Sequence, residues 1–249
     1  MPAGLYLRAW QSQALPPPST FGWLPLVTIA NNTLIDGNVA VPAIYPGPLL
    51  IVPFARAISE AGQLALLEEA QRLGLLDEVT DFTGGSLPGM AIGHIQITID
   101  GETREIVGDP ARLVRCDGAR CDAEPGTPEA FAAFWQELQN LEALMPAELG
   151  PVAPYEPERV AVLTVAPEPQ PDIQPQVAAW PLGVALTDFG QPYSGDPQMR
   201  CGVVEGDDLD ELLPSLLEGN QLTISVDEEE NVRSIIVRVM VPGEPSPCG

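Results

Sequence analysis

The sequence predicts an α+β fold made of two packed halves, each an antiparallel sheet backed by one or two helices and stabilised by disulfides. Three observations predict it. Apolar residues make up 45% of the 249 residues, which is enough to bury a core. Stretches of alternating apolar and polar residues, typical of half-buried strands, are interleaved with stretches of helical periodicity. Four cysteines indicate cross-links. We expect the halves to span residues 1–152 and 153–249. A single compact domain that contains both is the alternative.

The strands of the first half are predicted from alternation and from turn residues. Residues 6–10 alternate, and residues 24–29 form a second apolar run. Residues 95–99 also alternate, Asp100-Gly101 favours a tight turn, and residues 103–107 return as the second strand. This last segment is therefore predicted to be a β-hairpin.

Two helices of the first half are predicted from periodicity and capping residues. The clearer one spans residues 58–75, with Ser59 suited to cap its N-terminus. The other spans residues 127–144, where Thr127 is a natural cap and Pro128 suits the first helical position.

The second half repeats the order of strand, helix and hairpin. Residues 160–165 are apolar and predict a buried strand. A helix follows over residues 207–217, with Asp207-Asp208 at the positive end of its dipole. Residues 222–226 and 232–241 predict a long hairpin.

The charge balance narrows the classes of partner. The chain has 35 acidic and 11 basic residues, a net charge of −24, and all of its basic residues are arginine. A GC-rich genome and adaptation to high salt both explain this composition. Either way, such a charge repels phosphate backbones and anionic lipids, so we expect no nucleic-acid partner. Cations and basic protein surfaces are the partners that this charge attracts.

The cysteines bear on cellular location. Cys116 and Cys121 flank a short loop with an Asp-Gly turn, which brings two sulfurs within bonding distance; a bond from Cys201 to Cys248 would hold the C-terminal tail. The crossed pairings and a zinc site are the alternatives. Disulfides indicate an oxidising compartment, so we expect an extracellular, periplasmic or cell-surface protein whose export signal has been removed. The most apolar region, residues 39–58, contains four prolines and an arginine, and no transmembrane segment is expected.

Several segments carry a resemblance. They are Asp36-Gly37 with Tyr45-Pro46-Gly47-Pro48, the helix from Ile58 to Leu76, and Ala179-Trp180-Pro181-Leu182 with Phe189-Gly190-Gln191-Pro192, Arg200-Cys201, Val237-Arg238 and Val241-Pro242-Gly243-Glu244. Together they resemble a group of secreted proteins and lipoproteins from GC-rich bacteria that has no established activity. The resemblance spans about Leu5 to Cys248. It implies export and a bond between the last two cysteines, and it implies no catalytic residue and no ligand.

The residue inventory excludes most catalytic mechanisms. A chain without lysine forms no Schiff base and has no phosphate-loop lysine. His94 is the single histidine, so a Ser–His–Asp triad has no other base available. It lies on the polar face of a predicted strand, beside Gln96 and Thr98, and we interpret it as a solvent-facing or edge histidine. Ser86 lies in a glycine-rich loop without the Gly-x-Ser-x-Gly spacing of a nucleophile elbow.

Acidic clusters make calcium the one metal to consider. Asp207, Asp208 and Asp210 crowd one turn, and Asp227 and Glu229 crowd another. Neither cluster has the spacing of a known calcium loop. We interpret them as a charged helix N-terminus and a solvated hairpin turn, and we assign no catalytic, cofactor or metal residue.

We therefore expect a non-enzymatic extracellular or cell-surface protein that binds another protein, or forms part of a surface assembly, through exposed strand edges. One alternative is a secreted hydrolase that uses a pair of carboxylates. Another is an enzyme inhibitor that presents the loop at residues 82–90. Of the tryptophans, Trp135 is expected in the core and Trp180 is the first candidate for exposure.

Overall fold

The computed structural model describes residues 5–13, 15, 19–39, 45–86, 89–167 and 174–249. Its α+β class, with large sheets and few helices, confirms the class predicted from the sequence. The chain divides into two compact units, and a single boundary does not separate them. Unit 1 comprises Met1–Ala14, Pro25–Asn38 and Pro53–Tyr155; unit 2 comprises Leu15–Leu24, Val39–Val52 and Glu156–Gly249.

The sheet of unit 1 has eight strands in the order β10-β4-β3-β2-β1-β6-β7-β5. All neighbours are antiparallel except β5 and β7, which are parallel. The strands are β1 (Tyr6–Ser12), β2 (Val27–Ala30), β3 (Thr33–Asp36), β4 (Phe54–Ala57), β5 (Asp81–Phe82), β6 (Ile92–Ile99), β7 (Glu102–Gly108) and β10 (Ala153–Pro154). The hairpin predicted at residues 95–99 and 103–107 is confirmed as β6 and β7.

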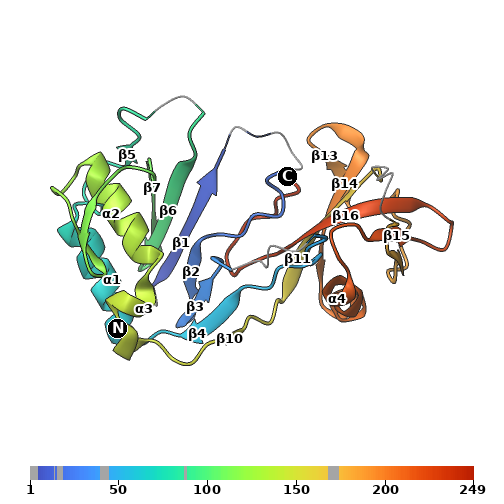
Figure 1. Ribbon diagram of the computed structural model, residues 1–249, viewed down its shortest axis with the longest axis horizontal. Coiled ribbons are helices and arrows are strands. Elements are labelled where there is room, and N and C mark those ends of the chain that lie inside the picture. Colours follow the sequence, from blue (N-terminus) through green and yellow to red (C-terminus); the bar gives the residue numbers. More distant parts are fainter. Residues whose placement is uncertain (1–4, 14, 16–18, 40–44, 87–88, 168–173) are drawn as a thin grey trace. The chain divides into compact units, whose positions relative to one another are not determined.

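Helices cover one face of this sheet (Figure 1). They are α1 (Glu60–Arg72), α2 (Pro128–Leu138), α3 (Leu141–Leu144) and the short 3₁₀ helix η1 (Pro146–Glu148). Both predicted caps are confirmed: Ser59 Oγ accepts the Gly62 N–H, and Thr127 Oγ1 accepts the Ala130 N–H. The helix expected over residues 127–144 is instead α2 and α3, because α2 ends at Leu138 and the backbone at Asn140 leaves the helical conformation.

The core of unit 1 lies between these helices and the sheet. Alternate residues of β1, β6 and β7 point into it, among them Leu7, Ile95 and Ile106, each with no exposed surface. Phe131 and Trp135 of α2 pack against them, and Trp135 is 1% exposed, which confirms its expected place in the core. More polar residues lie on the opposite faces of β1, β6 and β7.

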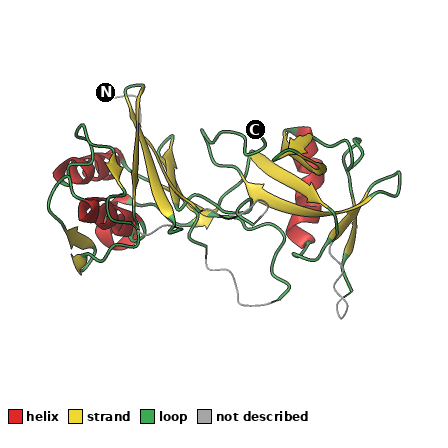
Figure 2. Ribbon diagram, turned by 90° about the horizontal axis from the view of Figure 1, so that it is seen from above, coloured by secondary structure: helices red, strands yellow, loops and turns green. Residues whose placement is uncertain are grey.

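Unit 2 contains a six-stranded sheet in the order β12-β15-β16-β11-β14-β13. The strands are β11 (Arg159–Val165), β12 (Val177–Ala179), β13 (Gln191–Tyr193), β14 (Asp196–Glu205), β15 (Ile224–Val226) and β16 (Val232–Val239). Helix α4 (Asp207–Glu218) lies against this sheet (Figure 2) and buries Leu209, Leu212 and Leu216. Its acidic first turn is as predicted, but the capping residue is Gly206, so Asp207 and Asp208 lie inside the helix.

Both proposed disulfides are present. Cys116 and Cys121 face each other across the hairpin of β8 (Arg115–Asp117) and β9 (Arg120–Asp122), which forms a separate two-stranded sheet in unit 1. Cys201 of β14 joins Cys248 near the C-terminus, 47 residues away. The second bond fixes the tail to the core of unit 2, where Phe21 and Met240 pack nearby.

The predictions missed β3, β4, β12 and β13, which span three or four residues each, and the ten-residue β14, in which proline, glycine and charged residues interrupt the alternation. Trp180, the first candidate for exposure, is 5% exposed and packs edge-on against Phe189. The expectations about residues 1–4, Pro42 and the loop positions 87–88 lie outside the described residues. Among the described helices, none is long and apolar enough to cross a membrane.

Candidate functional site

The outer edge of β7 is open over most of its length. This strand pairs with β6 throughout but with β5 only at Val107 and Gly108. The Val107 N–H donates to the Thr80 carbonyl at 2.9 Å, on the side away from β6. Backbone groups alternate in direction along a strand, so those of Thr103 and Glu105 point to the same outer side. Within the described residues they have no backbone partner there, which leaves a free strand edge.

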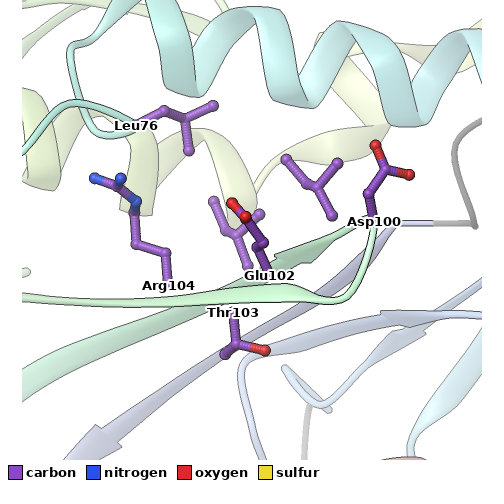
Figure 3. Close-up of a pocket in the computed structure, with 7 residues that line it drawn as sticks. Leu76, Asp100, Glu102, Thr103 and Arg104 are labelled. Atoms are coloured by element: carbon purple, nitrogen blue, oxygen red, sulfur yellow. The ribbon is translucent and has the colours of Figure 1, made fainter.

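A pocket of about 530 Å³ lies beside this edge. Figure 3 shows it between the end of the β6–β7 hairpin and the turn that follows α1. It is lined by Leu76, Ile97, Ile99, Asp100, Glu102, Thr103 and Arg104. The pocket thus combines an apolar interior with a charged rim.

The strand register explains this lining. Ile97 lies opposite Arg104, and Ile99 lies opposite Glu102, so all four side chains share the face of the hairpin that is turned toward the helices. Ile97 is buried, whereas Ile99 is partly exposed. The isoleucines form the apolar floor, and the polar side chains stand at its border.

The rim of the pocket is acidic. Arg104 is its one basic residue, and the Arg104 guanidinium donates a hydrogen bond to the Asp77 carbonyl oxygen. This bond ties the hairpin to the turn after α1. Asp100 and Glu102 are exposed, and within the described residues neither of them forms an ion pair. The rim therefore favours a basic ligand.

His94 is expected to face solvent or to lie at an edge; it lies on an inner strand, so the edge position is wrong. Its strand, β6, has β1 on one side and β7 on the other, and the His94 side chain is only 19% exposed. The ring is hydrogen-bonded to Ser12 and Glu105 and stacks on Trp10. Nothing in the local sequence indicates this cluster, because its members lie on three strands.

The calcium candidates form two separate groups. Asp207, Asp208 and Asp210 belong to the first turn of α4. Asp227 lies in the turn between β15 and β16, and its carboxylate accepts the N–H groups of Leu186, Glu229 and Asn231 at 2.8–3.0 Å. In the part of the chain that the structure describes, no three His, Cys, Asp or Glu side chains converge to hold a metal ion. Asp227 instead organises its own turn.

Hydrogen bonds also determine the pKa of Asp227. Burial raises the pKa of the Asp227 carboxyl, but the hydrogen bonds from Asn231, Leu186 and Glu229 outweigh it, so the pKa lies below its usual value. A carboxylate whose oxygens are occupied in this way is a poor ligand for an added cation.

Glu69 and Glu137 form a pair of carboxyl groups inside unit 1. Both are buried, Glu137 without any exposed surface. Burial raises the pKa of Glu137 to about 7, and the proximity of Glu69 adds to this effect. Burial also raises the pKa of Glu69, but Arg72 outweighs it and the net pKa is lowered. The pair faces the core and the β8–β9 hairpin, which is not the open cleft that carboxylate hydrolysis requires.

Ser86 donates a hydrogen bond to Asp109 at 3.2 Å and is half-buried. This hydrogen bond gives Ser86 a structural role in its loop. The single histidine, His94, is hydrogen-bonded to Ser12.

Comparisons with known proteins give no match. No protein-family model matches the chain, no curated protein is significantly similar to it, and no solved structure matches its fold. The function has to be argued from the geometry of this chain.

Proposed function

We propose that this protein is a secreted or cell-surface protein that binds another protein by adding an extended segment of its partner to the outer edge of β7. The observation that carries the proposal is the free edge of β7 beside an apolar pocket. Two disulfides favour an oxidising compartment outside the cytoplasm.

The edge supplies affinity and the pocket supplies selectivity. Thr103 and Glu105 each offer one N–H and one C=O group, which are the groups that a pairing strand needs. Side chains of an added strand alternate between the two faces of the sheet. Those on the helical face would reach the floor formed by Ile97 and Ile99, so the segment should place an apolar side chain there.

Charge argues for a basic segment and against a second copy of this chain. The exposed acids of this edge are Asp100, Glu102 and Glu105, and the whole chain carries −24. A lysine or arginine next to the inserted apolar side chain would reach this rim. Two copies paired edge to edge would bring the same acids together, which disfavours that arrangement.

A displayed library of random peptides tests the proposal. Thr103→Pro removes an outward N–H and leaves the backbone hydrogen bonds with β6 intact. Thr103→Ala is the control: like the proline variant it lacks the threonine hydroxyl, but it keeps the N–H. Peptides selected on the wild-type protein should bind Thr103→Ala within about threefold and Thr103→Pro about tenfold or more weakly, because one backbone hydrogen bond is worth roughly 1 kcal/mol or more. Circular dichroism melts confirm that both variants fold.

Two further variants test the pocket. Ile99→Thr keeps the branch at Cβ but shortens the side chain and makes the floor polar, and Glu102→Arg reverses the charge of the rim. Both changes should weaken binding of the selected peptides several-fold. Equal binding to Thr103→Pro and Thr103→Ala, or a failure to select any peptide, would count against the proposal. Self-association that Thr103→Pro abolishes would instead assign the edge to a second copy.

A further inference from the structure

Three neighbouring strands bring a serine, a histidine and a glutamate into one hydrogen-bonded chain on the face of the unit 1 sheet opposite its helices. Ser12 Oγ lies 2.8 Å from His94 Nε2, and His94 Nδ1 lies 3.1 Å from Glu105 Oε1. In β1 and β6, Trp10 is directly opposite His94 and Ser12 is its diagonal neighbour. In β7, Val107 is opposite His94 and Glu105 is the diagonal neighbour. The register alone therefore places the three side chains side by side.

These contacts define one arrangement of protons. A carboxylate only accepts hydrogen bonds, so Nδ1 carries the proton that it donates to Glu105. Nε2 then has a free lone pair, which accepts the hydroxyl proton of Ser12. This is the order of roles that activates a serine nucleophile: the hydroxyl faces the basic nitrogen and the carboxylate holds the other nitrogen.

Trp10 and Arg8 hold the imidazole in place. The rings of Trp10 and His94 are stacked, with centroids 5.0 Å apart and planes 10° from parallel. The Arg8 guanidinium carbon lies 4.1 Å from the centre of the same indole and limits its movement.

Ser12 is accessible and lies beside unpaired backbone. The side chain is exposed, as are those of Gln11 and Gln13. The pairing of β1 with β2 ends at Ala9, so among the described strands residues 10–12 pair only with β6. Because backbone direction alternates, either Gln11 or Ser12 turns its N–H to the open side. That N–H is a candidate donor for an oxyanion.

We propose that Ser12 is an acyl-accepting nucleophile, with His94 as its general base, and that the site hydrolyses carboxylic esters. This activity goes beyond the strand edge proposed above and shares Glu105 with it: the edge uses the backbone groups of Glu105, and the relay uses its carboxylate. Ser12 Oγ bonds to the ester carbonyl carbon as its proton passes to His94 Nε2, and that proton leaves with the alcohol when the ester C–O bond breaks. Water then attacks the acyl-serine, gives its proton to Nε2, and the carboxylic acid and Ser12 are released. Glu105 is a positioning residue, because it acts through His94.

A fluorophosphonate tests the nucleophile on the full chain. Ser12 Oγ displaces fluoride from phosphorus, and the adduct is located by peptide mass spectrometry. We expect labelling of the wild-type protein at Ser12, no labelling of Ser12→Ala, and labelling about 100-fold or more slower in His94→Gln. Thr98→Ala, a change on the same sheet face outside the relay, should label at the wild-type rate. Hydrolysis of p-nitrophenyl acetate should follow the same order.

The single histidine gives a second readout. In an NMR spectrum of the ¹⁵N-labelled protein at pH 8, the imidazole signals belong to His94 without further assignment. We expect the Nδ1–H tautomer in the wild type and in Ser12→Ala, and a shift toward Nε2–H in Glu105→Gln, which should also label at least about tenfold more slowly. Absence of labelling at Ser12, labelling that His94→Gln leaves unchanged, or an Nε2–H tautomer in the wild type would each overturn the proposal.

Discussion

The Cys121 backbone N–H donates a 2.8 Å hydrogen bond to the Glu137 carboxyl group. The Cys121 carbonyl accepts a hydrogen bond from Arg72 at 3.2 Å, and Arg72 also forms an ion pair with Glu69. The disulfide-bonded β8–β9 hairpin is thus attached to both α1 and α2 through one buried polar cluster. Its stability depends on the protonation of Glu137, whose second oxygen, Oε2, is buried and accepts no hydrogen bond.

Glu137 should make the protein less stable as pH rises. Its folded pKa of about 7 lies above the unfolded value of 4.5, so the folded state binds more protons between these two values. The free energy of unfolding should therefore fall between pH 4.5 and pH 7, by on the order of 3 kcal/mol, and level off above pH 7. Glu137→Gln should remove this decline, because its amide keeps the contacts of the protonated acid. Urea unfolding across this pH range measures the effect.

The loss of stability between pH 4.5 and pH 7 is specific to Glu137. Glu69 and Asp227 have lowered pKa values, so their contributions are present above their unfolded values of 4.5 and 3.8 and are lost as pH falls below them. Glu156→Gln, at an exposed position, is the control and should keep the wild-type profile. A profile of Glu137→Gln that declines as steeply as the wild type would show that the buried acid is not responsible.

Any side chain at position 108 should destabilise the protein. A Cβ at this position would lie 2.4 Å from Cγ of the Phe131 ring. Gly108→Ala should lower the free energy of unfolding by about 1–3 kcal/mol, because β7 or α2 must shift in a closely packed core. Gly84→Ala, where a Cβ meets nothing within 4 Å, should change it by less than about 0.5 kcal/mol. Chemical denaturation compares the two, and equal losses would contradict this packing.

The two disulfides should contribute unequally. The Cys201–Cys248 bond closes a loop of 47 residues and the Cys116–Cys121 bond one of five. The chain-entropy relation gives about 4 kcal/mol for the longer loop and about 2 kcal/mol for the shorter. Paired Cys→Ser variants, compared by thermal unfolding, should show the larger loss for the 201/248 pair. A larger loss for the 116/121 pair would indicate that attachment of the β8–β9 hairpin matters more than the tail.

Asp227 should be needed for the β15–β16 turn. Its two oxygens accept N–H groups from Leu186, Glu229 and Asn231. Asn at this position offers one acceptor oxygen and turns an NH2 group toward another donor, so Asp227→Asn should lower the melting temperature by several degrees. Glu228→Gln, exposed in the same turn, should leave it unchanged. The melting temperatures of both variants with and without added calcium then show whether the acidic clusters bind this ion.

Sequence reasoning was most accurate where a structure is defined by neighbours along the chain. The β6–β7 hairpin follows from alternation around Asp100-Gly101, and the helix starts follow from Ser59 and Thr127. It failed for short strands such as β4 and β12, whose residues are exposed or half-buried and lack a periodic pattern. It also did not place Trp180, since the proline after it says nothing about Phe189, which packs against it.

The candidate sites depend on contacts between distant residues. The sequence by itself determined the α+β class, the net charge, the single histidine and the short disulfide ring, because composition and local spacing are sufficient for each. Only the tertiary structure decided that Ser12 and Glu105 flank His94, and that β7 has a free edge beside a pocket. The physical reason is strand register: a shift by one residue would turn His94 to the other face, and the register is determined by burial of the entire sheet face.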